Sequence, residues 1–219
     1  MIGFAVVTLG LLVFPGISAQ NVRAVDLEPE VLDYLDVMRA EQGRMHNVPE
    51  VDGRFLRAVV LISKAQRVLE IGTSNGYSAI WLGLGLSETG GRLTTIEIDE
   101  NRHRLAEENF HEAGMANIIE AIRGDAFDVV PTLDGGFDLA FIDLGRGGLT
   151  RRAFDMVLPK MKPGGIILCH AVGFRGLGVG GDMRSFVEYI ENDPRLETFV
   201  IPMSRPGISL SIVRSVDDR

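Results

Sequence analysis

The segment VLEIGTSNGYS, Val68 to Ser78, places an acid and two glycines at the end of an apolar run. Glycines permit a tight turn and a close approach of the backbone to a ligand. A dinucleotide site would need G-x-G-x-x-G before a helix, but here three residues separate Gly72 from Gly76, and Glu70 lies two residues before Gly72. Because a carboxylate there would oppose a pyrophosphate, the loop favours a cationic ligand. A glycine-rich connection without a ligand is the alternative.

Two later apolar runs also end in acids. Glu97, in TTIEIDE, follows Gly72 by about 25 residues, where a carboxylate can accept hydrogen bonds from both hydroxyls of a ribose. Asp99 is expected to cap the next helix. In RGDAF, Asp125 and Ala126 are placed to meet an adenine edge, although Asp125 could equally be a cap for the following turn.

The apolar run GGIILCHAV ends in Cys169 and His170. Because side chains alternate along a strand, the two should face opposite sides of a sheet. Cys169 is expected to be a small buried residue. His170 has an ordinary pKa near 6.5, which suits proton removal at neutral pH, but it could also be a histidine bonded to backbone with no further role.

These residues could form one site only if the strands that carry them end next to one another. Two helices are predicted first, within residues 27–45 and 52–64, and helix-like segments recur at 78–86, 100–114, 150–161 and 186–192. Between them lie short apolar runs at 67–72, 92–99, 117–124, 137–143, 164–172, 195–202 and 207–215. Strands that alternate with helices and are rich in Val, Ile and Leu predict a parallel sheet covered on both faces. The turn before the last run is too short for a crossover helix, which predicts an antiparallel strand.

The predicted fold is therefore α/β: a Rossmann-like, doubly wound sheet of seven strands, mostly parallel, with an antiparallel last strand and extra N-terminal helices. We expect residues 21–219 to form one domain, with a helical lead-in over about 27–65 and the core over about 66–219. A formal net charge of −8 argues against a nucleic-acid partner. The single cysteine excludes an intramolecular disulfide.

Residues 1–20 have the composition of an export signal. An uncharged run from Ile2 to Phe14 is followed by a Pro-Gly break and by small residues before Gln20. No Lys or Arg precedes the run, so a hydrophobic N-terminal helix packed on the domain or a partner is the alternative. The run is too short to span a bilayer comfortably, and we expect no membrane span in the mature chain.

Taken together, VLEIGTSNGYSAIWL, GGRLTTIEID, RGDAF, FDLAFID and LPKMKPGGIIL, in this order and spacing, resemble the S-adenosylmethionine-dependent O-methyltransferases of the catechol and caffeoyl-CoA type. The resemblance is close over about Asn47 to Val172. It implies O-methylation of a small phenolic or catechol-like hydroxyl, with S-adenosylmethionine as cofactor, and a dimer. The cofactor residues that it implies are Val48, Glu70, Gly72, Ser78, Glu97, Asp125, Ala126 and Asp143.

The chain departs from this family at the reaction centre. The family holds a divalent ion with an acid after the fourth strand and an Asp-Asn pair after the fifth. Asp143 matches the acid, but the pair falls on His170 and Ala171, and the position of the family's catalytic lysine is Arg146. A metal is therefore doubtful, with Asp143 and His170 as its ligands if one binds.

Arg146 stays protonated and cannot replace a lysine base, but it can pair with an anionic acceptor. The catalytic residues predicted here are thus His170 as base, Asp143 to orient it, and Arg146. Two alternatives remain open: a cofactor-binding protein without catalysis, and a nicotinamide-dependent oxidoreductase, which fits the fold but not the loop. The N-terminus suggests an exported or periplasmic protein, whereas the cofactor argues for the cytoplasm.

Overall fold

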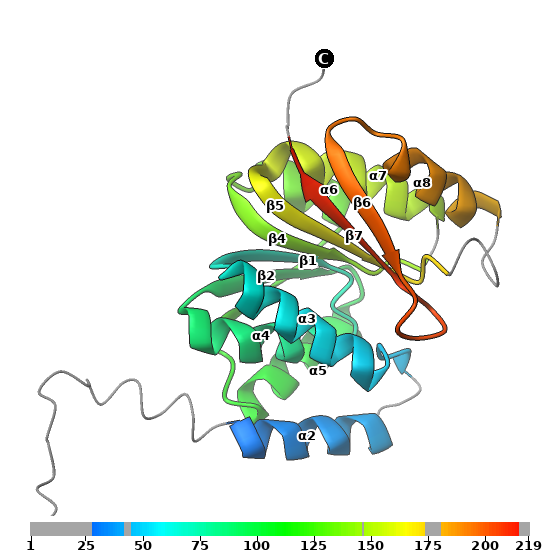
Figure 1. The fold of residues 1–219 in the computed structure, drawn as a ribbon. Helices are drawn as coiled ribbons and strands as arrows, with labels where there is room; N and C mark the ends of the chain where they lie inside the picture. Colours follow the sequence, from blue (N-terminus) through cyan, green and yellow to red (C-terminus); the bar gives the residue numbers. More distant parts are fainter. Residues whose placement is uncertain (1–27, 42–44, 146, 174–180, 215–219) are drawn as a thin grey trace, which may run out of the picture.

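The computed structural model describes residues 28–41, 45–145, 147–173 and 181–214. Within these residues seven strands form one sheet in the order β3-β2-β1-β4-β5-β7-β6 (Figure 1). The strands are β1 (Arg67–Ile71), β2 (Arg92–Glu97), β3 (Ile119–Arg123), β4 (Phe137–Ile142), β5 (Met161–His170), β6 (Leu196–Ile201) and β7 (Ile208–Val213).

The pairing confirms the predicted topology. β1 pairs in parallel with β2 and with β4, β2 with β3, and β4 with β5. β7 lies between β5 and β6 and is antiparallel to both. The chain leaves β1 toward β2 and β3, then returns to place β4 on the other side of β1. This reversal of strand order is where an open α/β sheet forms a ligand crevice, beyond the carboxyl ends of its strands.

Helices cover both faces of the sheet (Figure 1). On one face lie α2 (Glu28–Glu41), α3 (Glu50–Ser63), α4 (Tyr77–Thr89) and α5 (Glu100–Glu112), and on the other α6 (Ala126–Val129), α7 (Gly147–Val157) and α8 (Gly181–Glu191). Val68 faces the first group and Leu69 the second. Burial of both faces explains why the strands read as nearly unbroken apolar runs.

The N-terminal helices belong to the core. Val31, Leu35 and Met38 of α2, predicted from their spacing to share one face, are all buried in the cluster that also contains α3 and α4. The two predicted lead-in helices are therefore present. The predicted signal segment, residues 1–20, lies outside the described residues.

Three elements begin three or more residues earlier than the sequence predicts. α7 begins at Gly147 and α8 at Gly181, both earlier than expected, so residues 181–185 are helical and not part of a loop. β5 begins at Met161, because the register shifts between Phe137 and Leu139 of β4 and leaves residues 162–165 as an irregular stretch of the strand. That stretch contains a proline and two glycines, which are uncommon within strands, so the apolar pattern predicted a later start for β5.

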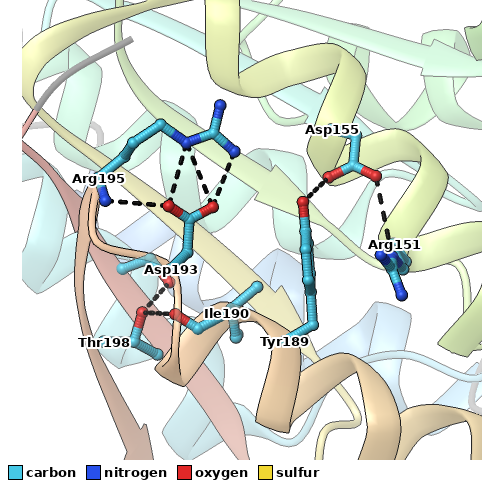
Figure 2. Close-up of polar contacts among 8 residues, drawn as sticks. Arg151, Asp155, Tyr189, Ile190, Asp193, Arg195 and Thr198 are labelled. Atoms are coloured by element: carbon cyan, nitrogen blue, oxygen red, sulfur yellow. Dashed lines mark hydrogen bonds and ion pairs between the residues drawn. The ribbon is translucent and has the colours of Figure 1, made fainter. Parts of the chain in front are cut away.

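Polar contacts hold α7, α8 and the start of β6 together (Figure 2). The Tyr189 hydroxyl donates to Asp155 at 2.7 Å, and the Arg151 guanidinium lies over the Tyr189 ring. Asp193 accepts from both the backbone and the side chain of Arg195 in the turn before β6. None of the predicted site residues takes part in these contacts.

In the parts of the chain that the structure describes, no helix has both the length and the apolar character needed to cross a membrane.

Candidate active site

A cleft runs along the carboxyl ends of β1, β2 and β4. Its larger cavity has a volume of about 380 Å³ and its smaller one about 20 Å³, and both are lined by Gly72, Ser74 and Asp143. Of the eight predicted cofactor residues, the larger cavity is also lined by Glu97, Asp125 and Ala126, and the smaller one by Val48 and Ser78. Seven of the eight therefore lie on one continuous cleft.

The turn after β1 brings the backbone against β4. Gly72 has a φ of 98°, and a Cβ there would lie 2.3 Å from the Asp143 carbonyl oxygen. Only glycine fits this combination of conformation and close approach. The backbone N–H of Ser74, which has a φ of 51°, then donates to Glu97 at 2.7 Å. The turn thus links the ends of β1, β2 and β4.

Glu97 is a buried acid in a fixed orientation. One carboxylate oxygen accepts from Ser74 N–H at 2.7 Å, and the other accepts from Asp99 N–H at 2.9 Å. Each oxygen keeps a lone pair for a further donor, so the group is suited to accept from the two hydroxyls of a ribose. Asp99 caps α5 through the N–H groups of Asn101 and Arg102, as predicted.

Asp125 is a helix cap as well as a cleft residue. Its carboxylate accepts from the N–H of Phe127 at 2.8 Å and begins the short helix α6. The capping role that the sequence left open is therefore present, at a place where Asp125 and Ala126 also line the larger cavity.

Glu70 lies beneath the cleft and not on its wall. It is fully buried, and it accepts from the hydroxyls of Ser78 at 2.7 Å and Thr95 at 2.5 Å. Burial raises the pKa of Glu70 to about 7, against the lowering effect of these two hydrogen bonds. At neutral pH this carboxyl is thus poised between its neutral and charged forms.

The segment before α3 covers the narrow end of the cleft. The Ser74 hydroxyl donates to the Met45 carbonyl at 3.1 Å, which ties this segment to the β1 turn. Val48 is buried, and both polar atoms of the Asn47 side chain are buried without a hydrogen-bond partner in the described structure. Since buried polar groups are nearly always satisfied, the Asn47 amide indicates a polar ligand in the smaller cavity.

Side chains of α2 and α5 also stabilise the turn after β1. The Asn109 amide donates to the Asn75 carbonyl at 2.7 Å, and the Tyr34 hydroxyl donates to Asn109 at 2.8 Å. These contacts connect α2 and α5 to the turn. Sequence reasoning did not identify them, because no local pattern relates the three residues.

The tips of β4 and β5 meet as predicted, but with a third residue. Nδ1 of His170 lies 3.1 Å from Asp143, and Nε2 lies 3.1 Å from Asp52, a fully buried acid in the first turn of α3. Asp52 also accepts from the Ser204 hydroxyl at 2.6 Å. We call Asp52, His170 and Asp143 the acid-histidine cluster. Sequence reasoning missed Asp52, since an acid in the first helical turn is ordinary.

The cluster favours a charged histidine. Burial lowers the pKa of His170, but the hydrogen bonds to Asp143 and Asp52, together with their charges, outweigh it and raise the pKa to about 9. A ring that carries both protons has no lone pair with which to accept another. The role of His170 as base stays a prediction that would require one of the two carboxylates to move away.

Cys169 is fully buried on the opposite face of the sheet, as predicted, and burial raises the pKa of its thiol to about 12. Arg146, the third predicted catalytic residue, lies outside the described residues.

The cluster does not have the geometry of a metal site. A divalent ion needs several ligand atoms that converge on one point at about 2.0–2.6 Å. Here the two ring nitrogens point toward carboxylates on opposite sides of the imidazole, each at hydrogen-bond distance. Among the described residues there is no group of three His, Cys, Asp or Glu side chains arranged to hold a metal.

Comparisons with known proteins agree with this architecture. The family described as O-methyltransferase matches residues 22–214, so the chain belongs to the O-methyltransferase family. A catechol O-methyltransferase of Mycobacterium tuberculosis is 38% identical over 54% of this chain and 59% of its own length. Another, of Niastella koreensis, is 34% identical over 55% of each chain. The matched part of this chain thus spans little more than half of these two relatives.

Solved structures resemble a larger part of the chain. The O-methyltransferase of Bacillus cereus in complex with SAH has a TM-score of 0.72 and 29% identity, and covers 84% of this chain and 90% of its own. The O-methyltransferase TomG of Streptomyces achromogenes in complex with SAM has a TM-score of 0.69 and 27% identity, and covers 94% and 93%.

Proposed function

We propose that this protein is an S-adenosylmethionine-dependent methyltransferase that acts on a hydroxyl of a small phenolic or catechol-like acceptor. The observation that carries the proposal is the cleft, in which Glu97 and Asp143 lie on either side of the Gly72 turn, whose sequence lacks the G-x-G-x-x-G pattern of a pyrophosphate site. The cofactor's sulfonium and ammonium groups are cations, which suit acids. Membership of the O-methyltransferase family supports the same assignment.

The residues of the cleft fit the parts of this cofactor. Glu97 would accept from the ribose hydroxyls, and Asp125 and Ala126 would flank the adenine. Ser78 and the unsatisfied amide of Asn47 would bind the amino-acid end in the smaller cavity. Asp143 lines both cavities and would therefore lie beside the reacting methyl group.

The cofactor supplies the activated methyl group, so the chain has to align the acceptor and receive its proton. We propose that Asp143 receives it. One of its oxygens faces Nδ1 of His170 at 3.1 Å, and a carboxylate has further lone pairs for the acceptor hydroxyl. As the oxygen–methyl bond forms, the hydroxyl proton passes to Asp143, while His170 keeps the carboxylate in place.

The test is methyl transfer by the purified chain. With methyl-labelled S-adenosylmethionine and a panel of catechols and phenols, we expect labelled ether products, and Asp143→Asn should lower kcat by at least about a hundredfold. Asp155→Asn, in an exposed acid of α7, is the matched control and should leave kcat unchanged. Calorimetry with S-adenosylmethionine and with NAD should show binding of the former only.

Clear cofactor binding without turnover on any acceptor would instead support a non-catalytic binding protein. Tight binding of NAD in place of S-adenosylmethionine would support the oxidoreductase alternative.

Export and dimer formation remain further proposals, each with its own measurement. A mature chain that starts at Gln20, found by mass spectrometry of cell fractions, would support cleavage of residues 1–20. A full-length chain confined to the cytoplasm would contradict it. Sedimentation of the purified protein should give the mass of a dimer, and a monomer at micromolar concentration would contradict that expectation.

A further inference from the structure

The acid-histidine cluster lies where the sequence led us to consider a metal ion. Its central feature is that His170 is enclosed by two carboxylates from different elements, Asp143 at the end of β4 and Asp52 in α3. Both ring nitrogens lie 3.1 Å from a carboxylate oxygen. Because a carboxylate can only accept, the ring satisfies both contacts only if both of its nitrogens carry protons.

Asp52 needs such a partner. It is fully buried, with Oδ2 accepting from His170 and from the Ser204 hydroxyl, and with Oδ1 buried and without a partner in the described structure. A buried carboxylate without a compensating cation is strongly unfavourable. The charged ring of His170 is that cation, and it also lies beside Asp143.

We propose that the protonated ring of His170 takes the place of a divalent ion in this protein, and that Asp52 is the positioning residue that holds it there. The inference rests on the proposed methyl transfer. In that reaction the acceptor oxygen bonds to the methyl group, the methyl–sulfur bond breaks with its electron pair left on sulfur, and the hydroxyl proton passes to Asp143. His170 keeps both protons throughout, so methyl transfer needs no divalent ion.

The position after His170 supports the proposal. Ala171 has no oxygen atom in its side chain, so the strand end offers no second ligand of the kind that a hard divalent ion prefers. The two side chains that contact the ring nitrogens, Asp143 and Asp52, are both acids.

The first experiment uses the unmodified full chain. Its initial rate should be the same, within about twofold, after treatment with EDTA and after addition of Mg²⁺ or Mn²⁺. Calorimetry with Mn²⁺ alone should show no binding below about 1 mM. A rate that falls to background with EDTA and returns with either ion would overturn the proposal, as would tight Mn²⁺ binding that is lost in His170→Asn.

The second experiment measures the protonation state of the His170 ring directly. With ¹⁵N-labelled histidine, and with His170→Asn for assignment, NMR at pH 7.5 should show protons on both ring nitrogens of His170. A neutral ring would overturn the proposal. Cofactor binding is measured separately by calorimetry. If the proposed function fails, the Mn²⁺ titration and the NMR spectrum of His170 still test this proposal.

Asp52→Asn tests the positioning role. We expect the His170 ring to lose one proton at pH 7.5, and kcat to fall about tenfold while KM for S-adenosylmethionine changes less than about twofold. Asp33→Asn, in an exposed acid of α2, is the matched control and should alter neither the spectrum nor the rate. A doubly protonated His170 in Asp52→Asn would contradict the role of Asp52. If that variant does not fold, the experiments on the unmodified chain still decide the proposal.

A further experiment tests whether substitutions at this strand end can introduce metal binding. The double variant His170→Asp and Ala171→Asn restores the acid and amide pair that the resemblance expects at this strand end. It should bind Mn²⁺ at least about tenfold more tightly than the unmodified chain. Equal Mn²⁺ affinity in the two proteins would show that this position does not decide metal binding, against the proposal.

Discussion

Glu70 illustrates how one side chain can oppose folding and favour binding. Burial raises the pKa of Glu70 to about 7, so at pH 8 its carboxylate is charged in both the folded and the unfolded chain. The charge is less favourable in the folded chain, where the carboxylate is buried. We expect Glu70→Gln to increase the free energy of unfolding at pH 8 by about 1–3 kcal/mol. Chemical denaturation measures this, with Glu120→Gln, at an exposed position of β3, as the control. An unchanged or lower stability would contradict it.

The same variant should weaken cofactor binding. Glu70 lies behind Ser78, so its charge would favour the cofactor's ammonium group at short range. We expect Glu70→Gln to weaken binding about tenfold. In the unmodified chain, binding at pH 6.5 should release protons, because the ligand favours the charged form of Glu70. Calorimetry in buffers with different ionisation enthalpies detects this release, and its absence would argue against coupling between Glu70 and the ligand.

Gly72 lies where the β1 turn leaves no room for a side chain. A side chain there would meet the Asp143 carbonyl at 2.3 Å and would also adopt a φ of 98°. We expect Gly72→Ala to destabilise the chain by about 2–4 kcal/mol. Gly148→Ala is the control, since Gly148 is exposed in α7 with open space around its Cα. It should be neutral or slightly stabilising. Equal stabilities of the two variants would refute the close-approach argument.

At the scale of elements, the end of β5 carries a backbone strain that a substitution can relieve. Ala171, directly after the strand, has a φ of 59°, a conformation that asparagine tolerates better than alanine. We expect Ala171→Asn to raise the free energy of unfolding by up to about 1 kcal/mol. Thermal and chemical unfolding measure it. Ala171→Val, which is β-branched, should be destabilising, and the reverse order would contradict the strain.

At the scale of the whole molecule, two raised pKa values predict how stability depends on pH. The folded-state pKa of Glu70, about 7, exceeds its ordinary value of 4.5, and that of His170, about 9, exceeds 6.5. In both cases the unfolded chain releases the proton first. Each group's contribution is therefore most favourable below its ordinary pKa, and declines as the pH rises through the folded value.

We therefore expect the free energy of unfolding to fall between about pH 4.5 and 9, by about 3 kcal/mol or less from each group. Repulsion within a chain of net charge −8 acts in the same direction. Urea titrations from pH 5 to 9.5 measure the slope. Glu70→Gln should flatten it mainly below pH 7, and His170→Asn mainly above pH 6.5. A stability that rises with pH across this range would be inconsistent with both pKa values.

The sequence by itself determined the fold and most of the cleft. The alternation of apolar runs with helical segments reports burial on both faces of a parallel sheet, and the carboxyl ends of such strands necessarily meet at one edge. Each of Gly72, Glu97, Asp125 and Asp143 lies at the carboxyl end of a strand or within two residues of it, so their places on the cleft could be predicted from local order alone.

The tertiary structure alone decided the surroundings of His170 and Glu70. Asp52 is 118 residues from His170 in the chain, and Ser204 is 152 from Asp52, and no local pattern relates residues so far apart. Glu70 was expected on the wall of the cleft, but the pleat of β1 turns it toward Ser78 of α4 and beside Thr95 of β2. Charge state depends on burial and on contacts between elements, so only the packed structure could show that His170 lies between two acids.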